Sequence, residues 1–131
     1  SKLVRLWEGA RLAVDSDNPD KARHATVSMR ELLTHIIHTL APDEEIRQWT
    51  SDPAMYDKEK PTRRARLLYI CRHVNYDPFT KFVNRDVDSM IEVIALLQRL
   101  HQLEGPFDER QLKALRARVE GLLRFLLEIA L

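Results

Sequence analysis

Apolar residues recur every three or four positions along most of this chain, which is the spacing that gathers side chains on one face of an α-helix. The first such segment spans about residues 2–15, and the second spans about residues 19–40. Pro19 suits the first turn of the second helix, with Asn18 as its cap. The alternation of polar and apolar residues that marks a β-strand is absent, so we predict no strand.

The middle of the chain predicts a short helix and a long loop. Pro42 ends the second helix, and the acids of Asp43–Glu45 favour the start of a short helix whose apolar face holds Ile46 and Trp49. The polar segment of residues 50–61 contains two prolines and predicts the longest loop of the chain.

Four signals organise the second half of the chain. Thr62 caps a helix that reaches about Val74, and a turn at residues 75–78 separates it from a helix over about residues 79–103. The apolar stripe of the latter helix includes Phe82, Val83 and Val87. Gly105–Pro106 ends that helix, and Asp108 caps the last helix, which runs to the C-terminus. These elements predict an all-α fold, an up-and-down bundle of about five helices.

Composition indicates the general class of protein and the compartment, but it does not indicate a ligand. The 21 basic and 20 acidic side chains nearly balance, so the net charge by itself requires no polyanionic partner. The single cysteine cannot form an internal disulfide, which favours the reducing cytoplasm. No apolar run reaches the roughly 20 residues of a membrane span, so we expect no membrane association. We expect one domain over residues 1–131, and the start at Ser1 rather than Met leaves open a domain excised from a longer protein or a processed chain.

The densest basic stretch begins the helix predicted after Thr62. Arginine and lysine at this density can contact the phosphates of a nucleic acid or dock a partner protein. The alternative is a solvated helix face that the acids of Asp43–Glu45 or Asp52 neutralise. The candidate nucleic-acid-binding residues are Arg63, Arg64, Arg66 and Arg72.

Two arginine–histidine pairs carry the residue types that metal-independent RNA cleavage needs, namely a cation that holds the phosphate and an imidazole that moves a proton. Arg30 precedes His35 by five residues, and Arg66 precedes His73 by seven. Positions seven apart share a helix face, whereas positions five apart do not quite. Because arginine is abundant in this chain, the alternative for both pairs is ordinary surface charge.

Histidines also raise the question of a metal. His35 and His38 lie three positions apart, and Glu31 could supply a third ligand from the preceding turn. The simpler interpretation has both histidines bordering the core, and Glu31 pairing with an arginine on a largely buried helix. Since no second ligand pair accompanies them, we expect no metal and no other cofactor. We expect Cys71, on the apolar side of its helix, to be buried and unreactive.

The segment from Pro19 to Asp43 resembles a signature of the bacterial proteins called predicted pPIWI-associating nucleases. The shared elements are an Asn-Pro helix start, the Arg-Glu-Leu-Leu core that begins at Arg30, the following His35 and an Ala-Pro-Asp stop. The block Arg63–Leu67 and His101, before the final helix, fit the same pattern. The resemblance implies a role in defence against phage or plasmids.

The chain is also similar to the HEPN class of helical domains, which includes RNases of defence and toxin–antitoxin systems. This similarity makes Arg30 with His35, or Arg66 with His73, the catalytic candidates. The sequence departs from the HEPN catalytic pattern directly after each arginine, where Glu31 and Leu67 stand. Because HEPN domains commonly dimerise, the similarity also implies a homodimer.

Three functions stay open from the sequence. The first is a recognition or assembly domain of a prokaryotic defence system, with RNA or a partner protein of the same operon as its ligand. The second is a metal-independent HEPN-type RNase. The third is a structural domain of a larger protein. The sequence does not decide between them, nor does it decide whether the chain is an enzyme.

Overall fold

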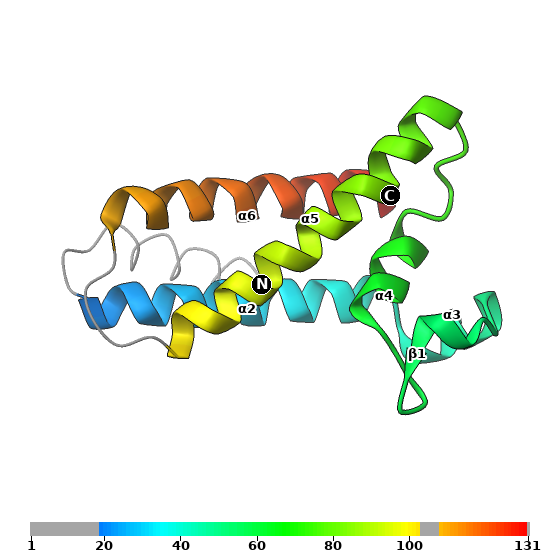
Figure 1. Ribbon diagram of the computed structural model, residues 1–131, viewed down its shortest axis with the longest axis horizontal. Helices are drawn as coiled ribbons and strands as arrows, with labels where there is room; N and C mark the ends of the chain where they lie inside the picture. Colours follow the sequence, from blue (N-terminus) through cyan, green and yellow to red (C-terminus); the bar gives the residue numbers. More distant parts are fainter. Residues whose placement is uncertain (1–18, 103–107, 131) are drawn as a thin grey trace. The chain divides into compact units, whose positions relative to one another are not determined.

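The computed structural model describes residues 19–102 and 108–130 (Figure 1). The helix predicted over residues 2–15, the cap Asn18 and the link Gly105–Pro106 lie outside these residues. The described part is built almost wholly from α-helices, so the predicted all-α bundle is confirmed. Its helices are α2 (Pro19–Leu40), α3 (Asp43–Trp49), α4 (Arg63–Ile70), α5 (Asp77–Gln102) and α6 (Glu109–Ala130). Among them, none is both long and apolar enough to cross a bilayer.

The described residues divide into two compact units. Unit 1 comprises residues 19–34, 92–102 and 108–123. Its core residues recur at helical spacing on α2, α5 and α6, which confirms the predicted inward faces. Asp108 accepts hydrogen bonds from the backbone N–H groups of Arg110 and Gln111, and it therefore caps α6 as predicted. The buried apolar side chains of unit 1 are Ala25, Met29, Leu32, Leu33, Val93, Ile94, Leu97, Leu112, Leu115, Val119, Leu122 and Leu123.

Unit 2 comprises residues 35–91 and 124–130, and it contains α3 and α4 whole. Ile46 of α3 and Leu67 of α4 are fully buried in it. The hydroxyl of Thr62 accepts a hydrogen bond from the backbone N–H of Ala65 at 3.0 Å, so this residue caps α4 as predicted. Other buried apolar residues of the unit are Ile36, Ile37, Ala41, Ala65, Tyr69, Ile70, Cys71, Val83, Val87, Met90 and Leu126.

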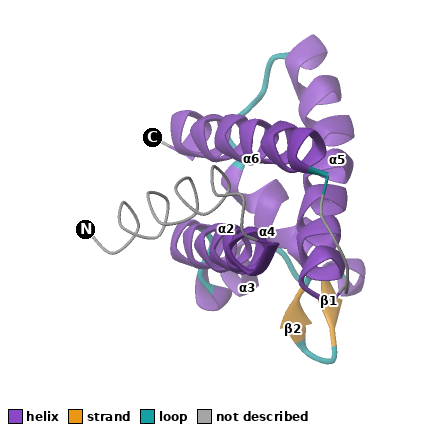
Figure 2. Cartoon of the chain, turned by 90° about the vertical axis from the view of Figure 1, so that its left-hand side faces the viewer, coloured by secondary structure: helices purple, strands orange, loops and turns teal. Residues whose placement is uncertain are grey.

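The segment predicted as the longest loop is ordered locally. It forms a 3-10 turn, Pro53–Met55, and a small antiparallel hairpin of β1 (Tyr56–Asp57) and β2 (Lys60–Pro61) (Figure 2). The prediction of no strand is therefore wrong at this place. The hairpin escapes detection because each strand has only two residues, too few to show an alternating pattern.

Helix α4 ends at Ile70 and not near Val74 as predicted. After it the chain closes two tight turns, in which the N–H of Arg72 bonds to the carbonyl of Tyr69 and the N–H of Val74 to that of Cys71. These three-residue bonds replace the helical four-residue pattern and stop the helix. Helix α5 then begins at Asp77, two residues before the predicted start, with Pro78 in its first turn.

Candidate nucleic-acid interface

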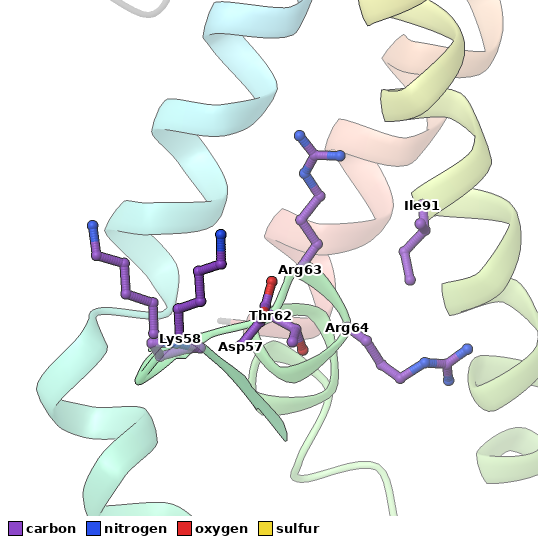
Figure 3. Close-up of a pocket in the computed structure, with 8 residues that line it drawn as sticks. Asp57, Lys58, Thr62, Arg63, Arg64 and Ile91 are labelled. Atoms are coloured by element: carbon purple, nitrogen blue, oxygen red, sulfur yellow. The ribbon is translucent and has the colours of Figure 1, made fainter. Parts of the chain in front are cut away.

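Four cationic residues lie where the hairpin runs into α4. Lys58 and Lys60 come from the hairpin, and Arg63 and Arg64 come from the first turn of α4. Together with Asp57 and Ile91 they line a shallow pocket of about 650 Å³, which we call the basic pocket (Figure 3). All four cations are exposed. The nearly neutral chain thus carries a local concentration of positive charge.

The hairpin is held in place by hydrogen bonds from the loop around it. The hydroxyl of Tyr56 donates to the backbone carbonyl of Thr50 at 2.6 Å, and the N–H of Thr62 bonds to the carbonyl of Met55 at 3.0 Å. At the tip, Lys58 and Glu59 adopt left-handed backbone angles, with φ of 51° and 68°. Two such residues in succession make the tight turn that suits a two-residue hairpin. Lys58 and Lys60 are therefore brought beside α4 by backbone geometry.

Carboxylates oppose only part of this charge. Arg64 forms an ion pair with Asp88 of α5, toward which its side chain extends in Figure 3. Asp57 is the acidic residue among those that line the pocket. No acidic residue lies in the first turn of α4, so the positive end of that helix dipole adds to the cations. The pocket is consequently suited to an anionic group.

Two of the four predicted nucleic-acid-binding arginines, Arg66 and Arg72, do not line the basic pocket. Arg66 is buried, and its guanidinium donates to the backbone carbonyl of Ala41 at 2.8 Å and to Oδ1 of Asp43 at 2.5 Å. The hydrogen bond from Arg66 is the main cause of a lowered pKa of Asp43, and the positive charge of Arg66 adds to it. Arg66 thus pairs with an acid of Asp43–Glu45, as the alternative expected, but it does so as a buried residue and not on a solvated helix face.

Arg72 lies over the ring of Tyr69, 3.8 Å from its centroid, and donates to the carbonyl of that same residue. Tyr69 in turn donates its hydroxyl to Glu45 at 2.7 Å, and the edge of its ring meets Trp49. Arg72 therefore packs as part of the α3–α4 contact, although it stays exposed.

The four predicted catalytic residues do not form one described cluster. Arg30 is half-buried and His35 is exposed, and their five-residue spacing places them about 140° apart around α2. His73 is exposed in the turn after α4, whereas Arg66 is buried within that helix. The expectation that Arg66 and His73 share a helix face is wrong, because α4 ends before His73.

A different histidine lies near Arg66. His38, in the last turn of α2, has a lowered pKa, first because of its partial burial and then because of the nearby positive charge of Arg66. Asp43 opposes this shift, and His35 adds slightly to it. The sequence offered His38 as a metal ligand or as a residue bordering the core, and no pattern in it showed that Arg66 of α4 lies near the end of α2.

Two further predictions concern residues outside the basic pocket. Glu31 is exposed, so its predicted role in a buried ion pair is wrong. Cys71 is buried as predicted, and burial raises the pKa of its thiol to about 11. Within residues 19–102 and 108–130, no group of three His, Cys, Asp or Glu side chains has the arrangement of a metal site.

Fold and pocket together define an all-α domain with a local basic surface. The chain belongs to the family of predicted pPIWI-associating nucleases, whose family model matches residues 1–126. The resemblance seen in the segment from Pro19 to Asp43 is thereby confirmed. Comparison with curated proteins and with solved structures gave no match.

Proposed function

We propose that this chain is the nucleic-acid-recognition domain of a prokaryotic defence system and that it holds phosphate groups in the basic pocket. The observation that carries the proposal is the meeting of four exposed cations, from the hairpin and from α4, around one pocket. Membership of a nuclease family supports nucleic acid as the ligand. A sequence-independent phosphate contact needs just such a group of lysines and arginines.

The form of the pocket favours a polymer backbone over a small molecule. Small-molecule sites are usually deep clefts that enclose most of the ligand. This pocket is shallow, and the four cations that line it are exposed. Lysine offers a mobile point charge, and arginine offers a planar fork that fits two phosphate oxygens.

The test is binding of labelled RNA and single-stranded DNA, followed by fluorescence anisotropy between about 50 and 200 mM salt. We expect affinity to fall steeply with salt. Lys58→Ala and Arg63→Ala should each weaken binding and reduce the slope of log K against log salt by about 0.7, the value for one lost phosphate contact.

Arg110→Ala is the matched control. Arg110 is exposed and lies beside Asp108, Glu109 and Lys113, so this variant removes the same charge from a surface of mixed sign. An equal loss of affinity in Arg110→Ala would show an effect of net charge alone. Full binding by the double variant of Lys58 and Arg63 would refute the proposal.

A second candidate is metal-independent RNA cleavage of the HEPN type, since the family description names a nuclease and the chain offers exposed histidines. His35, His38 and His73 are all exposed and could reach a substrate. Such cleavage should persist in EDTA and disappear in His35→Ala or His73→Ala while the helical circular dichroism is unchanged. His24→Ala, also at an exposed histidine of α2, is the control. Activity that survives in both variants would exclude these two histidines.

A further inference from the structure

Three phenylalanine rings that do not line the basic pocket contact one another in unit 2. Phe79 and Phe82 of α5 stack with ring centroids 5.8 Å apart, and both meet Phe125 of α6, at 6.5 and 6.2 Å. We call these three residues the phenylalanine cluster. Phe82 is 51% exposed and Phe79 is 38% exposed. The apolar stripe predicted for this helix included Phe82, but Phe82 is exposed, whereas Val83, Val87 and Met90 of the same stripe are buried.

Exposed aromatic rings that already touch one another form a ready contact surface. Burying such rings would be favourable, and a cluster of them left at the surface indicates a binding partner. Phe125 adds a third ring from α6, so the phenylalanine cluster draws on two helices.

Cations border the phenylalanine cluster. Phe82 lines a shallow pocket of about 480 Å³ together with Lys81 and Arg85, and Asp86 is the one acid among its lining residues. A partner that covers the rings would meet two positive side chains at the same time. Flat apolar groups joined to negative charges are the chemistry of nucleotides, so the partner that fits is a nucleic acid strand.

The cations continue along α5 toward the basic pocket. Lys81, Arg85 and Asp88 follow one another at spacings of four and three, so they lie on one face of the helix. Asp88 holds Arg64, a residue of the basic pocket. With a rise of about 1.5 Å per residue, Lys81 and Asp88 are about 10 Å apart along the axis. This face of α5 therefore joins the phenylalanine cluster to the basic pocket.

We infer that unit 2 binds single-stranded nucleic acid in preference to a duplex. Bases stack on Phe82 and Phe79, and the backbone follows Lys81 and Arg85 toward the basic pocket. The inference rests on the proposed function and adds to it the form of the nucleic acid. Bases within a duplex stack on one another and present no free face to a protein ring, whereas the bases of a single strand do.

The experiment compares one short labelled RNA, single-stranded or annealed to its complement, by anisotropy with the whole chain. We expect the single strand to bind more tightly. Phe82→Leu keeps an apolar side chain but removes the ring, and it should weaken single-strand binding roughly 10-fold, the loss of about one stacked base. Duplex binding should not change. Phe82→Trp should retain the preference, because an indole also stacks.

Leu96→Ala is the control, since Leu96 is an exposed apolar residue on the same helix. It should bind both forms like the unchanged chain. All variants must show the same helical circular dichroism, which is expected because Phe82 is largely exposed. Light scattering on the unchanged chain and on Phe82→Leu determines whether the phenylalanine cluster instead seats a second copy.

Failure of the proposed function and failure of this inference alone would give different results. If neither RNA form binds, the proposed function itself is refuted. If binding depends on Lys58 and Arg63 but is equal for both RNA forms and insensitive to Phe82→Leu, only this inference is refuted. A dimer that dissociates in Phe82→Leu while single-strand affinity is unchanged would also overturn the inference, because it would assign the cluster to self-association.

Discussion

The guanidinium of Arg66, in α4, donates hydrogen bonds to the carbonyl of Ala41 at 2.8 Å and to the carboxylate of Asp43 at 2.5 Å, and so holds α4 against the junction of α2 and α3. Residues 25 and 23 positions earlier in the chain are thus fixed by one side chain of α4. Ala41 is fully buried, so its carbonyl has no contact with solvent to replace a lost bond. Arg66 is consequently a structural residue of unit 2.

Replacing Arg66 should destabilise the fold. We expect Arg66→Met to lower the free energy of unfolding by about 2–4 kcal/mol, because it leaves a buried carbonyl unpaired and removes a charge-assisted bond. Urea denaturation followed by circular dichroism measures this loss. Arg63→Ala, at an exposed position of the same helix, should change stability by less than about 0.5 kcal/mol. Equal effects of the two substitutions would contradict the structural assignment.

Acidification should weaken unit 2 through His38. Burial, then the charge of Arg66, lowers the pKa of His38 in the folded state, so the unfolded chain binds the additional proton more readily. The stabilising contribution is present above the unfolded pKa of about 6.5 and is lost as the pH falls through the folded pKa. His38→Asn should flatten this part of the pH dependence of unfolding.

Proton NMR provides the direct measurement for His38. Its imidazole resonances should titrate below pH 6.5, the ordinary value, and the midpoint should rise in Arg66→Met. A midpoint above 6.5 in the unchanged chain would reverse the sign of the predicted stability change.

The tip of the hairpin offers a stabilising substitution. Glu59 has a φ of 68°, a region that costs a residue with a Cβ about 1 kcal/mol and that glycine adopts freely. Glu59→Gly should therefore stabilise the chain by up to about 1 kcal/mol in thermal or urea denaturation. Glu92→Gly, at an exposed position within α5, is the control and should instead destabilise by about 1 kcal/mol. Destabilisation by Glu59→Gly would show that its side chain is needed.

Core positions of unit 1 should respond strongly to truncation. Leu33 and Leu122 are both fully buried. Leu33→Ala and Leu122→Ala should each cost about 2–5 kcal/mol, the sum of lost burial and a residual cavity. Leu127→Ala, at an exposed position on α6, should cost much less. A loss below about 0.5 kcal/mol at Leu33 or Leu122 would mean that the helix faces are assigned wrongly.

Periodicity and capping residues were sufficient to predict most of the helices. Thr62 and Asp108 cap the helices that the sequence assigned to them, and the stripe through Met29, Leu33 and Ile37 is buried. These features depend on neighbours within one or two turns, so a linear pattern contains them. The end of α4 was harder to predict, because the turns that follow Ile70 contain neither glycine nor proline.

The candidate site was only partly predictable. Arg63 and Arg64 stood out by local charge density, but nothing local distinguished them from Arg66. The difference arises from Asp43 and Ala41, more than 20 positions away, whose proximity only the tertiary fold creates. Phe82 was misassigned for a related reason: a helix stripe shows which residues could be buried, and the packing of neighbours decides which are.

Cys71, the one cysteine of the chain, is buried in unit 2, so its reactivity can report how often unit 2 opens. Alkylating reagents attack the thiolate, and with a pKa of about 11 only about one thiol in ten thousand is ionised at pH 7. In the native state Cys71 should thus resist modification, and the slow labelling that does occur should measure how often the surrounding helices open. A ligand of the basic pocket that slows this labelling would reveal its binding energy without any dye on the protein or any change to its sequence.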